Sequence, residues 1–170
     1  MSCAMLGVME PVRYVDRLNS RYASQGFPPY KWTVNKDAPL TRPTKSLDES
    51  RITLLTSGGV SRACDAAWNP DARNDFRLDE IPANTDTSAF QVHDSYYETE
   101  SAQEDINCLF PVDRLNELAA EGVIGSVAPR LWSGFMGRIY KRTELQNEVA
   151  PAWAEELRLD DVDLALLVPA

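Results

Sequence analysis

The chain has 170 residues, of which 44% are hydrophobic, enough for one domain with a buried core. It carries 17 basic and 26 acidic residues, a net charge of −9, and no basic patch stands out, which argues against nucleic acid and anionic membranes as partners. No apolar run reaches the ~20 residues that a membrane span needs, and the N-terminus lacks the positive charge of a signal peptide.

Three cysteines, Cys3, Cys64 and Cys108, are widely spaced and form no CxxC pair. This spacing does not indicate a disulfide framework, and a cytoplasmic location is the simplest interpretation. His93 is the only histidine, which argues against a zinc centre. The residues themselves indicate no cofactor in this chain.

Apolar residues recur at helical spacing from Val12 to Tyr22 and predict an amphipathic helix over residues 12–24, which Gly26 ends. The first clear strand covers residues 51–57.

That strand runs into Gly58 and Gly59, and a glycine pair at a strand end can let a ligand approach the backbone closely. The pair is not part of a GxGxxG motif, and no GK[ST] follows, so a nucleotide site is not indicated.

Residues 61–88 are polar, and we expect irregular structure there up to a short strand near residues 77–81. Residues 90–93 alternate like a strand and bring His93 to a strand exit. The acidic residues that follow are typical of a solvated loop.

A helical pattern from Val112 to Ala119 ends at Gly122, and a strand is predicted over residues 123–128. Helix then strand across a short link is typical of a βαβ unit. Residues 131–140 contain two glycines and are expected to form a loop or a broken helix.

Thr143 and Gln146 form a capping box that predicts the start of the last helix, and Pro151 should break or kink that helix. The run at residues 162–168 is continuously apolar and suits a strand covered on both faces, as in a parallel sheet. Its four large side chains would contribute about 6–12 kcal/mol when buried. We therefore predict that this strand is central in the sheet.

The alternation of helices and strands predicts a single α/β domain over residues 1–170, with three layers and a mainly parallel sheet, like half of a Rossmann-like or flavodoxin-like fold. Parallel strands exit at one edge, where ligands bind. We expect that edge to gather the candidate site residues Gly58, Gly59, His93, Pro129, Arg130 and Ala170 around one concavity. Since the chain stops on such a strand, we interpret it as the front part of a longer protein, truncated at its active site.

Five segments follow one another along the sequence in this order: SRITLLTSGGV, HDSYY, DINCLFPVDRLNELAAEGVIGSVAPR, GFMG and VDLALLVPA. In this order they resemble the selenoprotein B family of glycine/sarcosine/betaine reductase and D-proline reductase, over roughly residues 10–170. The resemblance implies a selenocysteine or cysteine directly after Ala170, in a loop that follows the last strand. It also implies that a selenocysteine codon, taken as a stop, ends this sequence.

The activity implied by the resemblance is the reductive cleavage of a C–N bond of an amino acid or amine by a selenol or thiol. A pyruvoyl group on a partner subunit and a thiol electron donor such as thioredoxin are implied with it. A selenol ionises below pH 7, so the nucleophile needs no dedicated base.

Each candidate residue has an ordinary structural interpretation beside the functional one. His93 is a catalytic or orienting group, or else a structural hydrogen-bonding histidine. Cys108 precedes a helix and is a resolving or substrate-contacting thiol, or else a small apolar residue in the core. Arg130 binds a substrate carboxylate, or else forms a surface ion pair. Gly58, Gly59 and Ala170 are candidates for substrate binding.

Two other functions remain open on the sequence alone. The chain could be a non-catalytic binding or scaffold domain of the same fold. It could also be a cysteine-dependent α/β enzyme of another kind, with Cys108 as the nucleophile.

Overall fold

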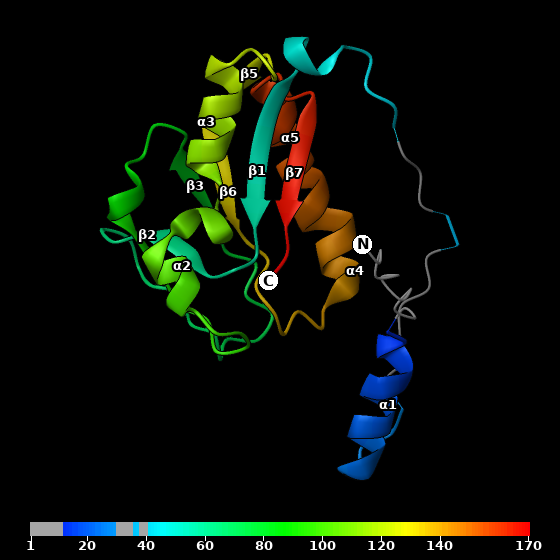
Figure 1. Cartoon of the computed structure of the whole chain (residues 1–170). Coiled ribbons are helices and arrows are strands. Elements are labelled where there is room, and N and C mark those ends of the chain that lie inside the picture. Colours follow the sequence, from blue (N-terminus) through cyan, green and yellow to red (C-terminus); the bar gives the residue numbers. More distant parts are fainter. Residues whose placement is uncertain (1–11, 30–35, 38–40) are drawn as a thin grey trace, which may run out of the picture. The chain divides into compact units, whose positions relative to one another are not determined.

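The computed structural model describes residues 12–29, 36–37 and 41–170. The chain divides into two compact units, residues 1–41 and residues 42–170. The first unit contains helix α1 (Tyr14–Ser24), which confirms the predicted N-terminal helix. The second unit contains the sheet and all other helices of the described residues (Figure 1). Cys3 lies outside the described residues.

The sheet is mainly parallel. Its strands are β1 (Arg51–Thr56), β3 (Leu78–Pro82), β5 (Ser126–Val127), β6 (Arg130–Gly134) and β7 (Leu164–Val168). Strands β5, β6 and β7 all run parallel to β1, and only β3 is antiparallel, to β6. The order across the sheet is β3-β6-β1-β7, with β5 beside the start of β1.

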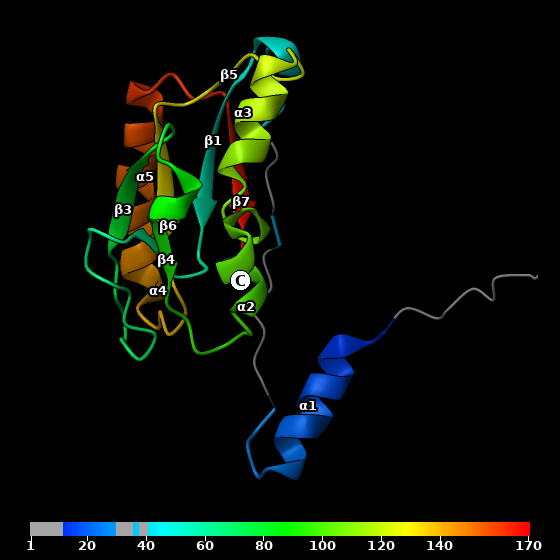
Figure 2. The same ribbon diagram turned by 60° about the vertical axis from the view of Figure 1, so that its left-hand side comes forward.

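Helices cover both faces of this sheet, which gives the predicted three layers. Helix α3 (Val112–Ala120) packs on one face and α5 (Ala150–Leu159) on the other (Figure 2). The remaining elements are η1 (Leu47–Glu49), β2 (Val60–Arg62), η2 (Thr87–Ala89), β4 (Phe90–Val92), α2 (Glu100–Glu104), η3 (Ile106–Cys108), α4 (Arg142–Glu144) and η4 (Leu145–Val149). No helix within the described part of the chain is long and apolar enough to cross a bilayer.

The two faces of the sheet bury different side chains. On the α3 face, Leu54 and Leu131 belong to the apolar core that also contains Val112 of α3. On the α5 face, Trp132 packs edge-on against Trp153, with ring centroids 6.3 Å apart. Alternate residues of each strand therefore serve opposite layers, as the strand period requires.

The predicted strand over residues 123–128 is wrong in its bounds. Only Ser126–Val127 are extended there, because the backbone N–H of Gly125 turns back to bond Leu47 and Ser50. The predicted loop or broken helix over residues 131–140 is wrong for residues 131–134, which belong to β6, and confirmed for residues 135–140, which form a loop. The longer strand in this region is β6, and it was missed because the glycines at 134 and 137 indicated a loop. Gly134 fits a strand because Leu78 of β3 crosses so closely that its Cδ1 would lie 2.7 Å from an added Cβ.

Strand β7 exists as predicted, but the prediction that it is central is wrong. Strand β1 is central, with β6 and β5 on one side and β7 on the other. On β7 the side chains of Leu166 and Leu167 are 41% and 58% exposed. An apolar run indicates that the side chains of a strand favour burial. It does not indicate whether the strand has a neighbour on one side or on both, and within the described sheet β7 pairs with β1 alone.

The last helix begins at Arg142 rather than at the predicted capping box. Lys141 is the N-cap residue, and Thr143 already lies inside α4 without a capping hydrogen bond. The predicted irregularity at Pro151 is present as a change of winding, because the π-helical turn η4 precedes α5 and Pro151 falls in the first turn of α5. Pro151 has no backbone N–H to donate, so the regular hydrogen-bond ladder of this continuous helix is interrupted at that residue.

Asp163 joins the start of β7 to the start of β1. Its carboxylate accepts a hydrogen bond from the backbone N–H of Arg51 at 2.9 Å and forms an ion pair with Lys45 at 2.8 Å. The bond from Arg51, and then the one from Lys45, lower the pKa of Asp163 below its ordinary value. The charged carboxylate is therefore the form that stabilises the β1–β7 pairing.

We expect this contribution to stability to depend on pH. Because the folded pKa of Asp163 is the lower one, its stabilisation is present above the ordinary pKa of about 3.9 and is lost as pH falls through the folded pKa. Asp163→Asn should therefore lower the urea midpoint clearly at pH 7 and much less at pH 3. Asp161→Asn, whose side chain is 88% exposed, is the matched control and should change little at either pH. Equal effects of Asp163→Asn at both pH values would contradict the assignment.

Candidate functional site

Strands β1 and β7 end side by side at one end of the sheet. The backbone N–H of Ser57 donates to the carbonyl of Val168 at 3.3 Å. The N–H of Ala170 donates to the hydroxyl of Ser57 at 3.2 Å. The segment 57–59 after β1 and the segment 169–170 after β7 are thus in direct contact, at the lower end of the sheet in Figure 1.

The strand order reverses between β1 and β7. The connection from β1 leads to β6 through α3 on one face, and the connection from β6 returns past β1 to β7 through α5 on the opposite face (Figure 2). In open α/β sheets, ligands bind in the crevice at the carboxyl ends of strands where the order reverses in this way. The ends of β1 and β7 are therefore the candidate site, which we call the β1–β7 edge.

Gly58 and Gly59 turn the chain at this edge, and both are buried. A Cβ on Gly58 would lie 3.0 Å from the side chain of Leu109. Gly59 has φ +67°, and a Cβ there would overlap the backbone carbonyl of His93. Close packing is thus enough to require glycine at 59, whereas at 58 the side chain of Leu109 would have to move, and the predicted substrate contact of both glycines stays a prediction.

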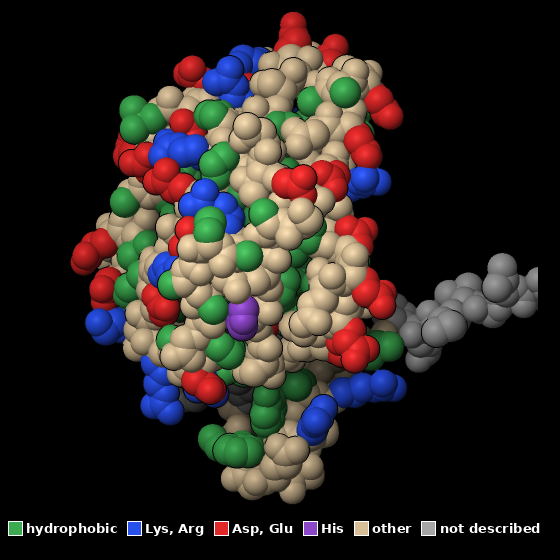
Figure 3. Space-filling view, turned by 90° about the vertical axis from the view of Figure 1, so that its left-hand side faces the viewer, with side chains coloured by type: hydrophobic (Ala, Val, Ile, Leu, Met, Phe, Trp, Pro, Cys, Tyr) green, Lys and Arg blue, Asp and Glu red, His purple; other side chains and the backbone are tan. Residues whose placement is uncertain are grey.

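His93 follows β4 and meets the glycine turn through its backbone. Its N–H donates to the carbonyl of Gly59 at 3.0 Å. Its side chain is exposed, and Figure 3 shows the imidazole at the surface. The backbone therefore fixes the position of His93, while the imidazole is left accessible.

Tyr97, which sequence reasoning did not single out, holds the same turn from the other side. Its hydroxyl donates to the carbonyl of Gly58 at 2.6 Å. Burial, and then the charge of Asp94, raise the pKa of Tyr97 to about 12, so the phenol remains a hydrogen-bond donor at neutral pH. A tyrosine just after a strand exit, with a ring to bury and a hydroxyl to satisfy, was the available signal.

The loop after β6 also reaches this edge. Phe135 adopts φ +55°, a left-handed conformation that bulky residues rarely take, and its ring packs edge-on against Trp153. The next residue, Met136, is buried, and its methyl group would lie 3.1 Å from a Cβ on Gly59. A strained backbone at the carboxyl edge of the sheet is typical of functional loops.

Cys108 is exposed at the end of η3, and not buried as its ordinary structural interpretation required. The N-terminus of α3 is occupied by Asn107 instead, whose side-chain oxygen accepts from the backbone N–H of Asp113 at 3.1 Å. The following residue, Leu109, is the one that packs on Gly58. Cys108 is therefore adjacent in sequence to a residue that contacts the β1–β7 edge. Its thiol does not have the contact with the N-terminus of α3 that the sequence indicated.

Pro129 and Arg130 do not lie with the other candidate residues. They were expected to follow the end of a strand over residues 123–128, but Pro129 instead precedes β6 and Arg130 is its first residue. Pro129 lines a cavity of about 590 Å³ with Ala83 and Asn116. Arg130 opens β6, and its carbonyl accepts from the hydroxyl of Thr53, in the middle of β1. The predicted single concavity around all six residues is therefore wrong for these two.

The guanidinium of Arg130 is held by three carboxylates. It pairs with Asp160 and Glu156, each at 2.8 Å, and with Glu80 at 3.4 Å. The hydrogen bonds that it donates to Asp160 and then to Glu156 raise the pKa of Arg130, and its guanidinium also lies 5.1 Å from the ring of Trp132. Of the two interpretations given for Arg130, this arrangement is the ion pair. The guanidinium is occupied by carboxylates of the chain itself, which does not support the predicted binding of a substrate carboxylate.

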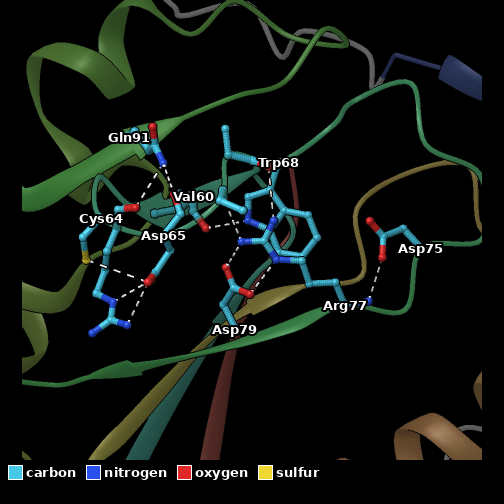
Figure 4. Close-up of polar contacts among 11 residues, drawn as sticks. Val60, Cys64, Asp65, Trp68, Asp75, Arg77, Asp79 and Gln91 are labelled. Atoms are coloured by element: carbon cyan, nitrogen blue, oxygen red, sulfur yellow. Dashed lines mark hydrogen bonds and ion pairs between the residues drawn. The ribbon is translucent and has the colours of Figure 1, made fainter.

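A second polar cluster fastens the loop between β2 and β3 (Figure 4). Arg77 stacks on the ring of Trp68 at 4.2 Å and pairs with Asp79 at 2.6 Å. Gln91 donates to the backbone carbonyl of Asp65 at 3.1 Å. Cys64 is exposed at the margin of this cluster, in contact with Asp65. These contacts hold a loop to its strands, and no group of three or more His, Cys, Asp or Glu within the described ranges could hold a metal ion.

The sequence profile of the family "Glycine/sarcosine/betaine reductase selenoprotein B" matches residues 11–170. A curated relative, D-proline reductase subunit gamma of Acetoanaerobium sticklandii, is 33% identical over 140 residues, which cover 82% of this chain and 53% of that protein. Another, glycine reductase complex component B subunit gamma of Symbiobacterium thermophilum, is 31% identical over 142 residues, covering 76% of this chain and 30% of that protein.

No solved structure matches the chain. The chain spans about half the length of the first relative and about a third of the second. The match to the family extends through every strand of the sheet, including β1 and β7, whose ends form the candidate site. This extent shows that the chain belongs to the glycine/sarcosine/betaine reductase selenoprotein B family.

Proposed function

We propose that this chain forms the front part of a reductase subunit that cleaves a C–N bond of an amino acid or amine through a selenol or thiol. The observation that carries the proposal is the β1–β7 edge, where the strand order reverses and the segments after both strands touch. The names of the relatives, subunits of D-proline reductase and glycine reductase, supply the reaction class.

The nucleophile belongs to the segment that follows β7. Our proposal is that a selenocysteine comes directly after Ala170 and that its selenolate attacks the substrate carbon that carries the nitrogen. A C–Se bond forms, and the electron pair of the C–N bond leaves with the nitrogen, which takes up a proton. Attack by the thiol of Cys108 on selenium then releases the reduced carbon, which is protonated, and leaves a Se–S bond. A donor dithiol reduces that bond to the selenol and the Cys108 thiol, and so supplies the two electrons.

The chain's own residues would position the reaction. Gly58 and Gly59, held by Tyr97, keep the floor of the edge rigid beneath the segment after Ala170. The exposed imidazole of His93 lies on this edge, and we assign it the transfer of the proton that the departing nitrogen needs. Cys108, also exposed, is the candidate resolving thiol.

The partners follow from the same reaction. The departing nitrogen requires activation, and we propose a pyruvoyl-bearing partner subunit, whose carbonyl condenses with the substrate nitrogen. Repeated turnover needs a supply of electrons, and we propose a thiol donor such as thioredoxin. Cys64 and Cys108 are both free thiols, which supports a reducing, cytoplasmic location.

The proposal predicts the nucleotide sequence after Ala170 and the product made from it. The next codon should be TGA, followed in frame by coding sequence, and cells grown with labelled selenium should contain a labelled protein heavier than 19.0 kDa. Sequencing of the genomic region and an autoradiograph of the immunoprecipitated protein make the two measurements. A TAA or TAG codon, with label absent, would favour the non-catalytic scaffold instead.

The proton-transfer role of His93 predicts a large kinetic effect from a small structural change. In the assembled complex, His93→Gln should slow amine release by about 10²-fold or more, since general acid–base catalysis contributes about 10²–10⁴-fold. The melting temperature should hardly change, because His93 contacts Gly59 through its backbone alone. Ser95→Ala, on the same exposed loop, is the control. A His93→Gln complex of normal rate would leave His93 a purely structural residue.

The resolving role of Cys108 predicts a defect in turnover and not in the first cleavage. With the natural dithiol protein as donor, Cys108→Ser should release about one amine per subunit and then stop, because the selenium would remain bound to carbon or donor. The matched control is Cys64→Ser, which removes the other exposed thiol of the α/β unit. Rapid-quench measurement of amine separates the first turnover from later ones. Continuous turnover by Cys108→Ser would exclude the role.

A further inference from the structure

The two edges of the sheet are built differently. The outer strand β3 has the sequence LDEIP, with Asp79, Glu80 and Pro82, and such charges and prolines protect an edge from further pairing. The outer strand β7 has the sequence LALLV, without a charge, a proline or a bulge. Within the described residues, β7 therefore has neither the charges nor the proline that protect β3, and no strand pairs with its outer side.

Half of the backbone groups of β7 face away from β1. The N–H of Ser57 donates to the carbonyl of Val168, and in a parallel ladder alternate residues bond to the same neighbour. With Leu54 in register with Leu166, this alternation directs the N–H groups of Leu164 and Leu166 to β1, whereas those of Ala165 and Leu167 point to the free edge. A neighbouring strand on that edge would satisfy the outward pair.

Both faces of β7 are also left partly uncovered. Leu166 pairs with Leu54 and so faces the α3 layer, where it is 41% exposed. Leu167 pairs with Leu55, which pairs in turn with Trp132 and so faces the α5 layer, where Leu167 is 58% exposed. A single strand laid along the edge would satisfy the backbone but would not bury Leu167, which needs a helix.

The handedness of the connections indicates where that helix belongs. The step from β6 to β7 passes across the sheet with α5 on its face. A further parallel strand beyond β7 continues in the same direction, and a right-handed crossover then places its helix on the same face, beside α5. That is the face on which Leu167 is most exposed.

We propose that the free edge of β7 takes a further parallel strand, delivered by a crossover helix that packs beside α5 and buries Leu167. The occupant is a helix–strand segment from the part of the family's longer chains that lies outside their match to this one. The chain spans only 53% and 30% of its two relatives, so their polypeptides have ample length for such a segment. Strand β7 is then an interior strand of the complete subunit, and the rest of the subunit continues this sheet instead of folding as a separate domain.

A second copy of this chain fits the edge less well. Two copies related by a two-fold axis would pair β7 with β7 in antiparallel fashion. No helix of either copy would then be added over Leu167. The inference depends on these contacts and not on the C–N cleavage proposed above, so either can fail without the other.

Amide hydrogen exchange tests the proposal on two proteins, the 170-residue chain and the intact D-proline reductase subunit gamma of A. sticklandii. In the 170-residue chain, the amides of Ala165 and Leu167 should exchange at least about tenfold faster than those of Leu164 and Leu166, which β1 protects. In the intact relative, all four aligned amides should exchange slowly. Equal fast exchange of the outward pair in both proteins would overturn the proposal. Slow exchange in the 170-residue chain that depends on its concentration would assign the edge to a second copy.

A substitution gives an independent readout of the helix. Leu167→Lys should leave the melting temperature of the 170-residue chain nearly unchanged, because the side chain is already 58% exposed there. The aligned substitution in the intact relative should unfold it or lower its melting temperature sharply, because a buried unpaired charge is strongly destabilising. Leu159→Lys, at a side chain 74% exposed on α5, is the matched control in both proteins. An intact relative that tolerates lysine at both positions would mean that no helix covers Leu167.

Discussion

Parallel pairing on both sides of β1 is the constraint on which the rest of this structure depends. Residues 52–56 are all buried, and the strand bonds to β5 and β6 on one side and to β7 on the other. Because side chains alternate, Leu54 must face α3 while Leu55 faces α5, and each layer of helix is needed to cover one of them. A change in β1 would therefore affect both layers, the register of β7 and the turn at Gly58.

The candidate site is a consequence of that arrangement. Since β6 and β7 flank β1 and are reached by connections on opposite faces, the chain leaves the ends of β1 and β7 uncrossed. The turn after β1 is then locked by contacts from remote segments, namely Tyr97, Leu109 and Met136. A rigid floor with an exposed imidazole beside it is a suitable support for a nucleophile delivered by the next segment.

The two halves of the sheet differ in how complete they are. On the β3 side, Arg130 is enclosed by carboxylates and Arg77 by Trp68 and Asp79, so both guanidinium groups are paired within the chain. On the β7 side, leucines are exposed on both faces and outward N–H groups lie along the edge. The same edge carries Ala170, next to the candidate site. Completion of the sheet and completion of the site are thus expected to involve the same region of the subunit.

By itself, the sequence determined what depends on local pattern and on motif. The helices at 14–24 and 112–120, the strands β1 and β7, the three-layer α/β class and the family all follow from periodicity and from segments such as the one that surrounds Cys108. These features survive because apolar spacing and turn residues act over a few neighbouring positions. Local pattern also brought His93 to a strand exit.

Only the tertiary structure decided which strand is central and which residues share the edge. Gly134 resembles a loop residue until Leu78 of β3 lies against it, and Arg130 resembles a ligand for a carboxylate until Asp160 and Glu156 reach it. In each case the deciding partner is close in space but absent from the local pattern, and a pattern of side chains does not contain the number or identity of neighbours supplied by distant segments.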